Sequence, residues 1–170
     1  SIFLGYLIGS IPSALIIGRL WKGIDIREYG SGNIGTTNTF RVLGTYPAII
    51  VLIADTLKGV AGVLIGSYLT NSEIGAVVGG LAAIAGHNWS VFIKFKGGRG
   101  VATAFGILLT ITPKVVVILV PIWLLIVVTT KYVSLASLTA AFATPLLMFL
   151  YKEPLEYCLF GLIAAIFVIY

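Results

Sequence analysis

Long apolar runs leave this chain few possible folds. Six of them come near the roughly 20 residues that a helix needs to cross a bilayer, and they lie at residues 1–21, 47–69, 74–93, 114–130, 133–150 and 155–170. The run from Val101 to Thr112 is shorter, but cations and Pro113 bound it, and the charge pattern below requires it to cross too. We therefore expect an all-α, polytopic membrane protein with seven transmembrane helices.

Composition agrees with a lipid environment. Of the 170 residues, 59% are hydrophobic and 10% are charged, and the mean hydropathy is +1.09. Exposing so much apolar surface to water would cost roughly 25 cal/mol per Å², which excludes a soluble domain of this size. One histidine and one cysteine, Cys158, are too few for a zinc site or an intrachain disulfide. We expect one integral membrane domain over residues 1–170, without a zinc site.

The cations lie mostly on one side of the expected membrane. With seven crossings, the segments 22–46 and 94–100 share a side with Lys131, whereas Lys114 and Lys152 lie on the other. Positive charge marks cytoplasmic loops, so the N-terminus is predicted outside and the C-terminus in the cytoplasm. The net charge of +5 is thus explained by topology and needs no nucleic acid partner. The longer loops are also cytoplasmic, and we expect function there.

A polar, glycine-rich segment, GSGNIGTTNTFR, follows the first expected span. It fits G-x-G-x-x-G, but a dinucleotide fold requires a βαβ unit, and here a membrane span follows. Closely spaced glycines let backbone N–H groups converge on an anion, and polar side chains with an arginine would complete such a site. The alternative is a flexible polar loop whose arginine marks topology. The candidate residues are Ser31, Gly32, Asn33, Thr37, Asn38 and Arg41.

The second cytoplasmic segment, KFKGGRG at residues 94–100, again combines glycines with cations. A helix is predicted to start in the VATAFG that follows, and its free N–H groups would suit a bound phosphate. The alternative is that the cations only mark topology, which explains the charges but not the glycines. The candidate phosphate-binding residues are Lys96, Gly97, Gly98 and Arg99.

His87 is the only histidine and lies near the cytoplasmic end of its expected span. It is either a hydrogen-bonded residue that caps a helix or a catalytic group. An HxxxxD acid/base motif is absent, because the position five residues later is Phe92. With so few acids in the chain, a serine–histidine–acid triad is also poorly supported.

Several polar or small residues lie within expected spans. Asp55 and Lys58 are three residues apart and share a helix face. An unpaired charge at that depth is costly, so we expect an ion pair that faces the bundle interior. Its role is a structural contact, a support for the loops or part of a polar site, and we favour the structural role. Ser137 is expected to bond its own helix backbone, and Gly75, Gly79 and Gly80 should permit close helix packing.

The stretches GSGNIGTTNTFRVLG, DTLKG, GHNWSVFIKFKGGRGVAT and YVSLAS resemble, in order and spacing, the bacterial acyl-phosphate:glycerol-3-phosphate 1-acyltransferases of the PlsY type. The resemblance implies an inner-membrane enzyme with its active site facing the cytoplasm and with no metal or cofactor. It implies acyl transfer from acyl phosphate to the sn-1 hydroxyl of glycerol 3-phosphate, which gives lysophosphatidic acid and inorganic phosphate. This is the first step of bacterial phospholipid synthesis, and the implied partners are both substrates and membrane lipid.

The resemblance also implies residue roles. It places His87, Ser137 and Asn33 among the catalytic residues. The residues expected to bind substrate are Ser31, Gly32, Asn33, Thr37, Arg41, Lys96, Gly97, Gly98 and Arg99. Arg99 stands where the family usually has lysine. The positive charge is kept, but a planar guanidinium that can donate two parallel hydrogen bonds replaces a compact ammonium group. Family members continue into a short basic segment, so part of the site is expected beyond Tyr170.

Acyl phosphate carries a good leaving group, so positioning and charge neutralisation should supply most of the acceleration. We expect a substrate phosphate oxygen, rather than His87, to accept the hydroxyl proton. Two other functions remain open on the residues alone. One is a transporter or channel for phosphorylated metabolites, although transporters tend to show internal repeats and polar residues near the midplane. The other is a non-catalytic lipid-binding subunit.

Overall fold

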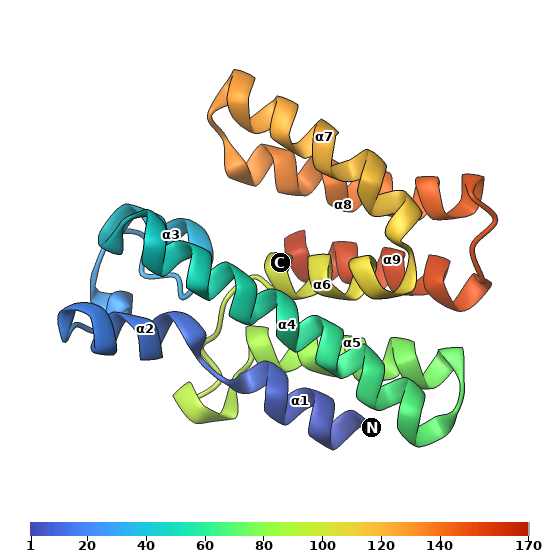
Figure 1. Cartoon of the computed structure of the whole chain (residues 1–170), viewed down its shortest axis with the longest axis horizontal. Helices are drawn as coiled ribbons and strands as arrows, with labels where there is room; N and C mark the ends of the chain where they lie inside the picture. The colour runs from blue at the N-terminus through green and yellow to red at the C-terminus, as the bar shows by residue number, and fades with distance from the viewer. Residues whose placement is uncertain (170) are drawn as a thin grey trace.

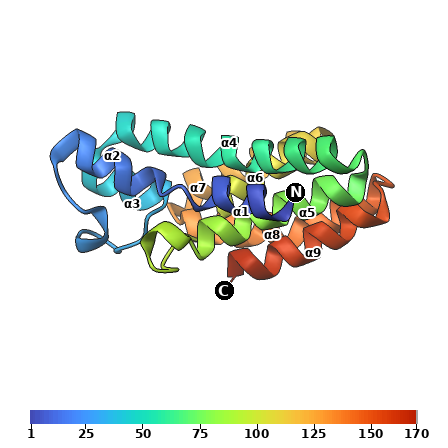
Figure 2. The ribbon, with the colours of Figure 1, turned by 90° about the horizontal axis from the view of Figure 1, so that it is seen from below.

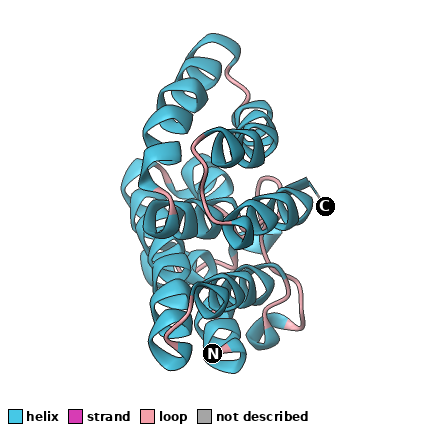
Figure 3. Cartoon of the chain, turned by 90° about the vertical axis from the view of Figure 1, so that its right-hand side faces the viewer, coloured by secondary structure: helices cyan, strands magenta, loops and turns pink. Residues whose placement is uncertain are grey.

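Every secondary-structure element that the structure describes is helical (Figure 3). The structure is a computed structural model that describes residues 1–169, with the side chains of residues 1–167. Its α-helices are α1 (Ile2–Ser10), α2 (Ser13–Lys22), α3 (Thr36–Leu43), α4 (Thr45–Thr70), α5 (Glu73–Asn88), α6 (Val101–Ile111), α7 (Pro113–Thr130), α8 (Val133–Leu150) and α9 (Leu155–Ile169). Two 3₁₀ turns, η1 (Ile26–Glu28) and η2 (Val91–Ile93), lie in the connections. The predicted all-α class is confirmed.

The longer helices run back and forth between two ends of an elongated molecule (Figures 1 and 2). Stretches long and apolar enough to cross a membrane are found at Ile2–Lys22, Thr45–Thr70, Glu73–Ile93, Pro113–Thr130 and Val133–Leu150. Helices α6 and α9 are also apolar, but they are shorter than these five stretches. The structure therefore supports a polytopic membrane fold with five candidate spans.

The first span, predicted as one run over residues 1–21, is broken in the middle. Helix α1 ends at Ser10 and α2 begins at Ser13, with Ile11 and Pro12 between them. Proline has no backbone N–H and clashes with the preceding turn of a helix, so the hydrogen-bond ladder stops there. The carbonyl groups at the end of α1 are consequently available to side chains from other helices.

Glycines let the central helices touch backbone to backbone. A methyl group at Gly66 of α4 would lie 2.0 Å from the carbonyl oxygen of Gly75 in α5, and one at Gly9 of α1 would lie 2.1 Å from that of Ala83. A methyl group at Gly59 would similarly lie 2.1 Å from the carbonyl oxygen of Thr103 in α6. This is the small-residue packing expected of membrane helices, and it confirms the role predicted for the glycines of α5.

A buried apolar cluster holds together the end of the molecule that carries the glycine-rich loops. It draws residues from α2, η1, α3, α4 and η2 as well as from the first loop. Its members are Ala14, Leu15, Ile26, Ile34, Leu43, Val51 and Ile93. Because Ile34 lies in the first glycine-rich segment and Ile93 directly precedes the second, one cluster anchors both segments. We call it the loop-anchoring cluster.

Candidate functional site

The first glycine-rich segment folds around the side chain of Asn38, which is 2% exposed. Its Oδ1 accepts a hydrogen bond from the Ser31 N–H at 2.9 Å. Its Nδ2 donates to the carbonyl oxygens of Tyr29 and Ile26, at 3.1 and 3.4 Å. Both bonds that Asn38 donates go to backbone carbonyl groups just before the segment, so the prediction that Asn38 serves as a donor to an anion was wrong. The side chain is instead the scaffold of the loop.

Two glycines of this loop have left-handed backbone conformations, with φ of 61° at Gly30 and 71° at Gly32. A methyl group at Gly30 would also lie 2.3 Å from Asn38 Oδ1. Residues with a side chain rarely adopt such φ angles, so glycine is required both for the turn and for the approach of Asn38. Helix α3, in a region predicted only as a polar segment, then starts directly after Gly35.

An ion pair holds the turn η1, which directly precedes this loop. Asp25 caps η1, and its carboxylate accepts hydrogen bonds from Arg27 Nε at 2.9 Å and from a terminal guanidinium nitrogen at 2.6 Å. These hydrogen bonds from Arg27 lower the pKa of Asp25 to about 2, and the same contact raises the pKa of Arg27. The pair is therefore charged at neutral pH.

The predicted ligands of the first loop lie around this scaffold. Among the residues that the structure describes, the side chains of Ser31, Asn33, Thr37 and Arg41 have no hydrogen-bond or ion-pair partner. Ser31 and Arg41 are exposed, and Asn33 and Thr37 are partly exposed. Their polar atoms are free to contact a ligand.

The second glycine-rich segment folds back onto the end of α5. The N–H of Gly97 donates to the carbonyl oxygen of Asn88 at 2.9 Å, and the N–H of Gly98 donates to that of His87 at 3.0 Å. A methyl group at Gly97 would lie 1.9 Å from the His87 carbonyl oxygen. These glycines therefore permit close backbone contact, and in this structure their N–H groups face α5 instead of converging on an anion.

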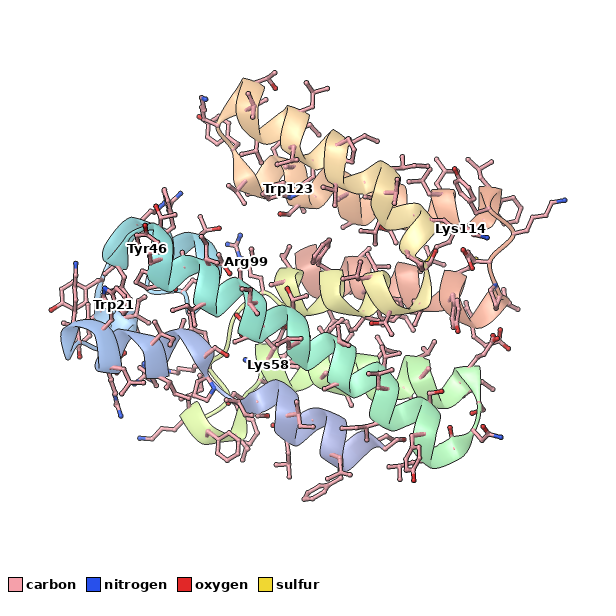
Figure 4. All side chains as sticks on the ribbon, viewed as in Figure 1. Trp21, Tyr46, Lys58, Arg99, Lys114 and Trp123 are labelled. Carbon is pink, nitrogen blue, oxygen red and sulfur yellow. The ribbon has the colours of Figure 1, made fainter. Side chains whose placement is uncertain are left out.

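A cavity of about 220 Å³ lies beside this loop. Its lining includes Lys96 and Arg99, whose side chains are exposed and form no ion pair with any described residue. The remaining lining residues are Asn88, Trp89, Phe95, Gly97, Gly98 and Phe167. Figure 4 shows Arg99 on the same side of the molecule as Trp21 and Tyr46, with Lys114 at the opposite end. The cavity thus joins two free cations to aromatic side chains.

Asn88 lines this cavity, and no sequence motif pointed to its role. Its Nδ2 donates to the carbonyl oxygen of Phe167 at 3.3 Å, and the rings of Trp89 and Phe167 meet edge to face at 5.5 Å. Both contacts tie the end of α9 to the second loop. Asn88 Oδ1 is buried and has no partner among the described residues.

His87 lies in the last turn of α5, beside the predicted intramembrane ion pair. Lys58 Nζ is 2.6 Å from Asp55 Oδ1, and Asp55 and Lys58 are 1% and 5% exposed. This confirms the ion pair that faces the bundle interior. The same Asp55 oxygen lies 3.8 Å from His87 Nδ1. The sequence offered His87 no acidic partner within its motif, but the fold provides one from α4.

Ser137 lies apart from these groups on α8. Its hydroxyl donates to the Val133 carbonyl oxygen at 2.9 Å and accepts from Trp123 Nε1 at 3.3 Å. The backbone bond is the one predicted. No hydrogen bond joins the Ser137 side chain to His87 or to either loop among the described residues, so the loops are anchored together without Ser137.

These features define a class: an all-helical integral membrane protein whose glycine-rich, cationic loops gather at one end of the bundle. The sequence model of the glycerol-3-phosphate acyltransferase family matches residues 1–170. The chain belongs to this family of membrane enzymes, as the sequence motifs led us to expect.

The most similar curated sequences include glycerol-3-phosphate acyltransferase 2 of Moorella thermoacetica. The two are 46% identical over 165 residues, which cover 97% of this chain and 84% of the relative. The glycerol-3-phosphate acyltransferase of Fusobacterium nucleatum is 46% identical over 169 residues, covering 99% of this chain and 87% of the relative.

The fold is also similar to crystal structures of PlsY (YgiH), described as an integral membrane glycerol 3-phosphate acyltransferase. Its glycerol 3-phosphate form has a TM-score of 0.92, and its lysophosphatidic acid form has a TM-score of 0.90. In both cases the sequences are 37% identical, and the match covers 99% of this chain and 84% of the other.

Proposed function

We propose that this enzyme transfers a fatty acyl group from acyl phosphate to the sn-1 hydroxyl of glycerol 3-phosphate, giving lysophosphatidic acid and inorganic phosphate. The observation that carries the proposal is the pair of glycine-rich loops anchored in one apolar cluster, surrounded by polar side chains and by cations that form no ion pair with any described residue. One similar protein has been solved in a glycerol 3-phosphate form and in a lysophosphatidic acid form, and these correspond to one substrate and one product of this reaction.

The enzyme is proposed to lie in the bacterial inner membrane as one domain with seven crossings. Besides the five long stretches, the shorter helices α6 and α9 would cross. With that count, the cation-rich loops share the cytoplasmic side, which places the N-terminus outside and the C-terminus inside. Aromatic residues such as Trp21 and Tyr46 are exposed at the same end, as interface-seeking side chains should be.

Glycerol 3-phosphate is assigned to the first loop. Ser31, Asn33 and Thr37 would bind its phosphate and glycerol oxygens, and Arg41 would pair with its charge. Arg99 would bind the same substrate from the second loop, since both loops are anchored in one cluster. Arginine binds a phosphate through two parallel hydrogen bonds, so Arg99 suits a position shared by both substrates.

Acyl phosphate is assigned to the cavity beside Lys96, with its acyl chain between helices in the lipid. Lys96 would neutralise the phosphate that leaves. His87 and Ser137 would orient the acyl phosphate, with Asn33 close to the hydroxyl that reacts. Ser137 requires a movement of α8 or a new rotamer, because its hydroxyl is engaged with α7 and α8.

The proposed reaction is assisted by substrate. The sn-1 hydroxyl oxygen attacks the acyl carbon, and the bond from that carbon to the phosphate oxygen breaks. A phosphate oxygen accepts the hydroxyl proton, so inorganic phosphate leaves with its charge neutralised by Lys96 and Arg99. Such positioning and preorganised charge are large contributors to catalysis, and no protein side chain has to become a strong base.

The test is turnover by the purified full-length protein. We expect phosphate to be released from acyl phosphate only when glycerol 3-phosphate is present, with one lysophosphatidic acid formed per phosphate. Acyl-CoA, offered as a competing donor, should give no product. If acyl-CoA supports turnover and acyl phosphate does not, the proposed donor is wrong. Uptake of glycerol 3-phosphate into vesicles without turnover would instead support the transporter.

A further inference from the structure

The imidazole of His87 is held between two different surroundings. On one side, Nδ1 lies 3.8 Å from Oδ1 of Asp55 in α4. On the other side, a methyl group at Gly98 would lie 2.3 Å from Nε2 and 3.1 to 3.2 Å from the adjacent ring carbons. The ring is 6% exposed. One ring nitrogen therefore faces a buried carboxylate, and the other faces the glycine-cation loop.

The position of the Asp55 carboxylate depends on Lys58, which also contacts the first span. Lys58 Nζ donates to Asp55 Oδ1 at 2.6 Å and also to the carbonyl oxygen of Ile11. That carbonyl lies in the break at Pro12, where it also accepts a hydrogen bond from the Ser13 N–H at 3.0 Å. The broken helix thereby determines where Lys58 lies, and Lys58 determines where the Asp55 oxygen lies. In Figure 4 Lys58 points from α4 toward this break.

A second set of contacts ties the same break to the chain that follows His87. Ser90 Oγ donates to the carbonyl oxygen of Ser10, and Ser10 Oγ donates to that of Tyr6 at 2.8 Å. Tyr6 Oη donates to the carbonyl oxygen of Trp89 at 2.6 Å. Ser10 and Ser90 are 0% and 1% exposed. These hydrogen bonds hold the two residues that follow Asn88 against α1.

We propose that Asp55 is a positioning residue for His87: the Asp55 carboxylate, oriented by Lys58 on the broken first helix, selects the imidazole tautomer with its proton on Nδ1 and presents Nε2 to the Gly97–Gly98 loop. The inference rests on the proposed function, because it gives this loop a substrate. A carboxylate that faces one ring nitrogen of a histidine commonly fixes its tautomer and orientation in this way.

The rival explanation is that Asp55 and Lys58 only stabilise the bundle. Removing Asp55 alone would leave Lys58 buried without its counter-charge, which destabilises any fold. The informative variant therefore removes both charges together, as Asp55→Asn with Lys58→Met. Replacing a whole buried pair by neutral side chains is often nearly neutral for stability. Glu153→Gln is a matched control, because it removes a carboxylate that bonds Thr112 far from His87.

Ring-nitrogen NMR tests the inference without any turnover. The chain has one histidine, so ¹⁵N-histidine labelling and a histidine-free purification tag give one pair of ring signals. We expect the wild type and Glu153→Gln to show protonated Nδ1 and unprotonated Nε2. The paired Asp55 and Lys58 variant should show a mixture of both tautomers. Identical spectra in the paired variant and the wild type would overturn the inference.

Steady-state kinetics provides the second readout. We expect the folded paired variant to lose about 100-fold in kcat, the cost typical of a catalytic group misplaced by about 1 Å. In a His87→Ala background the paired change should have no further effect. A paired variant with wild-type kcat, or one that slows the His87→Ala protein by the same factor, shows that the pair acts on stability alone.

The two proposals fail in different ways. A wild-type protein without turnover, or a fully active His87→Ala variant, contradicts the proposed function or the role of His87. The NMR spectra still decide in either case whether Asp55 positions the imidazole.

Discussion

Replacing Gly98 by alanine should separate the fold of the second loop from the catalytic role that we propose for it. The new methyl group would lie 2.3 Å from His87 Nε2, whereas ordinary contact begins at 3.4 Å. Gly98 does not have a left-handed φ, so the backbone accepts alanine, and the ring has to move by about 1 Å. A displacement of that size typically costs about 100-fold in rate, or about 2.7 kcal/mol. Phosphate release from acyl phosphate measures this loss directly.

Two further variants identify the cause of the loss. In a His87→Ala background the methyl group meets no ring, so adding Gly98→Ala should leave turnover unchanged. Gly97→Ala places its methyl group 1.9 Å from a backbone carbonyl oxygen, so it should lower the Tm far more than Gly98→Ala. A Gly98→Ala enzyme with wild-type kcat would refute the reasoning. So would one whose activity loss is explained entirely by unfolding.

Three other predictions concern different parts of the chain. Asn38→Ala removes three hydrogen bonds from the first loop, so it should cost about 2–3 kcal/mol of local stability and raise the KM for glycerol 3-phosphate; an unchanged KM would contradict the assignment of that loop. Gly66→Ala forces α4 away from α5 at the end remote from the loops, so it should lower the Tm in detergent while the surviving enzyme keeps its KM values. The pKa of Asp25 is depressed to about 2, so its contribution to loop stability is present above the ordinary carboxyl pKa and lost only as the pH falls through about 2. Asp25→Asn should therefore speed limited proteolysis of residues 22–46 by equal factors at about pH 6 and pH 8. A factor that changes between these pH values would contradict an Asp25–Arg27 pair that stays charged over this range.

Much of the fold follows from hydropathy alone, because a bilayer requires long apolar helices whatever their neighbours are. The Asp55–Lys58 pair was predictable for a similar reason: their spacing puts both on one helix face, and lipid makes an unpaired charge costly. The break at Pro12 is also encoded locally, although an apolar run that continues through it conceals the two half-helices. Helices α6 and α9 are apolar but shorter than the other candidate spans, so helix length alone does not decide whether they cross the membrane.

The details of the site depend on how the helices face one another, which spacing does not reveal. His87 and Asp55 meet only because α4 and α5 pack through their glycines. The sequence between the two residues does not predict how the two helices are rotated against each other. Glycine-rich loops suggested N–H groups that converge on an anion, but Gly97 and Gly98 direct theirs to α5. Asn38 looked like its polar neighbours Asn33 and Thr37, and only its burial identifies it as scaffold.

The central claim is that both glycine-rich loops face the cytoplasm and serve one reaction. Cysteines placed beside each loop, Tyr29→Cys and Phe95→Cys in a Cys158→Ser background, test it with an impermeant thiol reagent. Both native side chains are exposed, at 45% and 60%. We predict that both cysteines react in inverted vesicles, are protected in right-side-out vesicles, and react more slowly when both substrates are bound. Labelling of the two cysteines from opposite sides of the membrane would contradict the account.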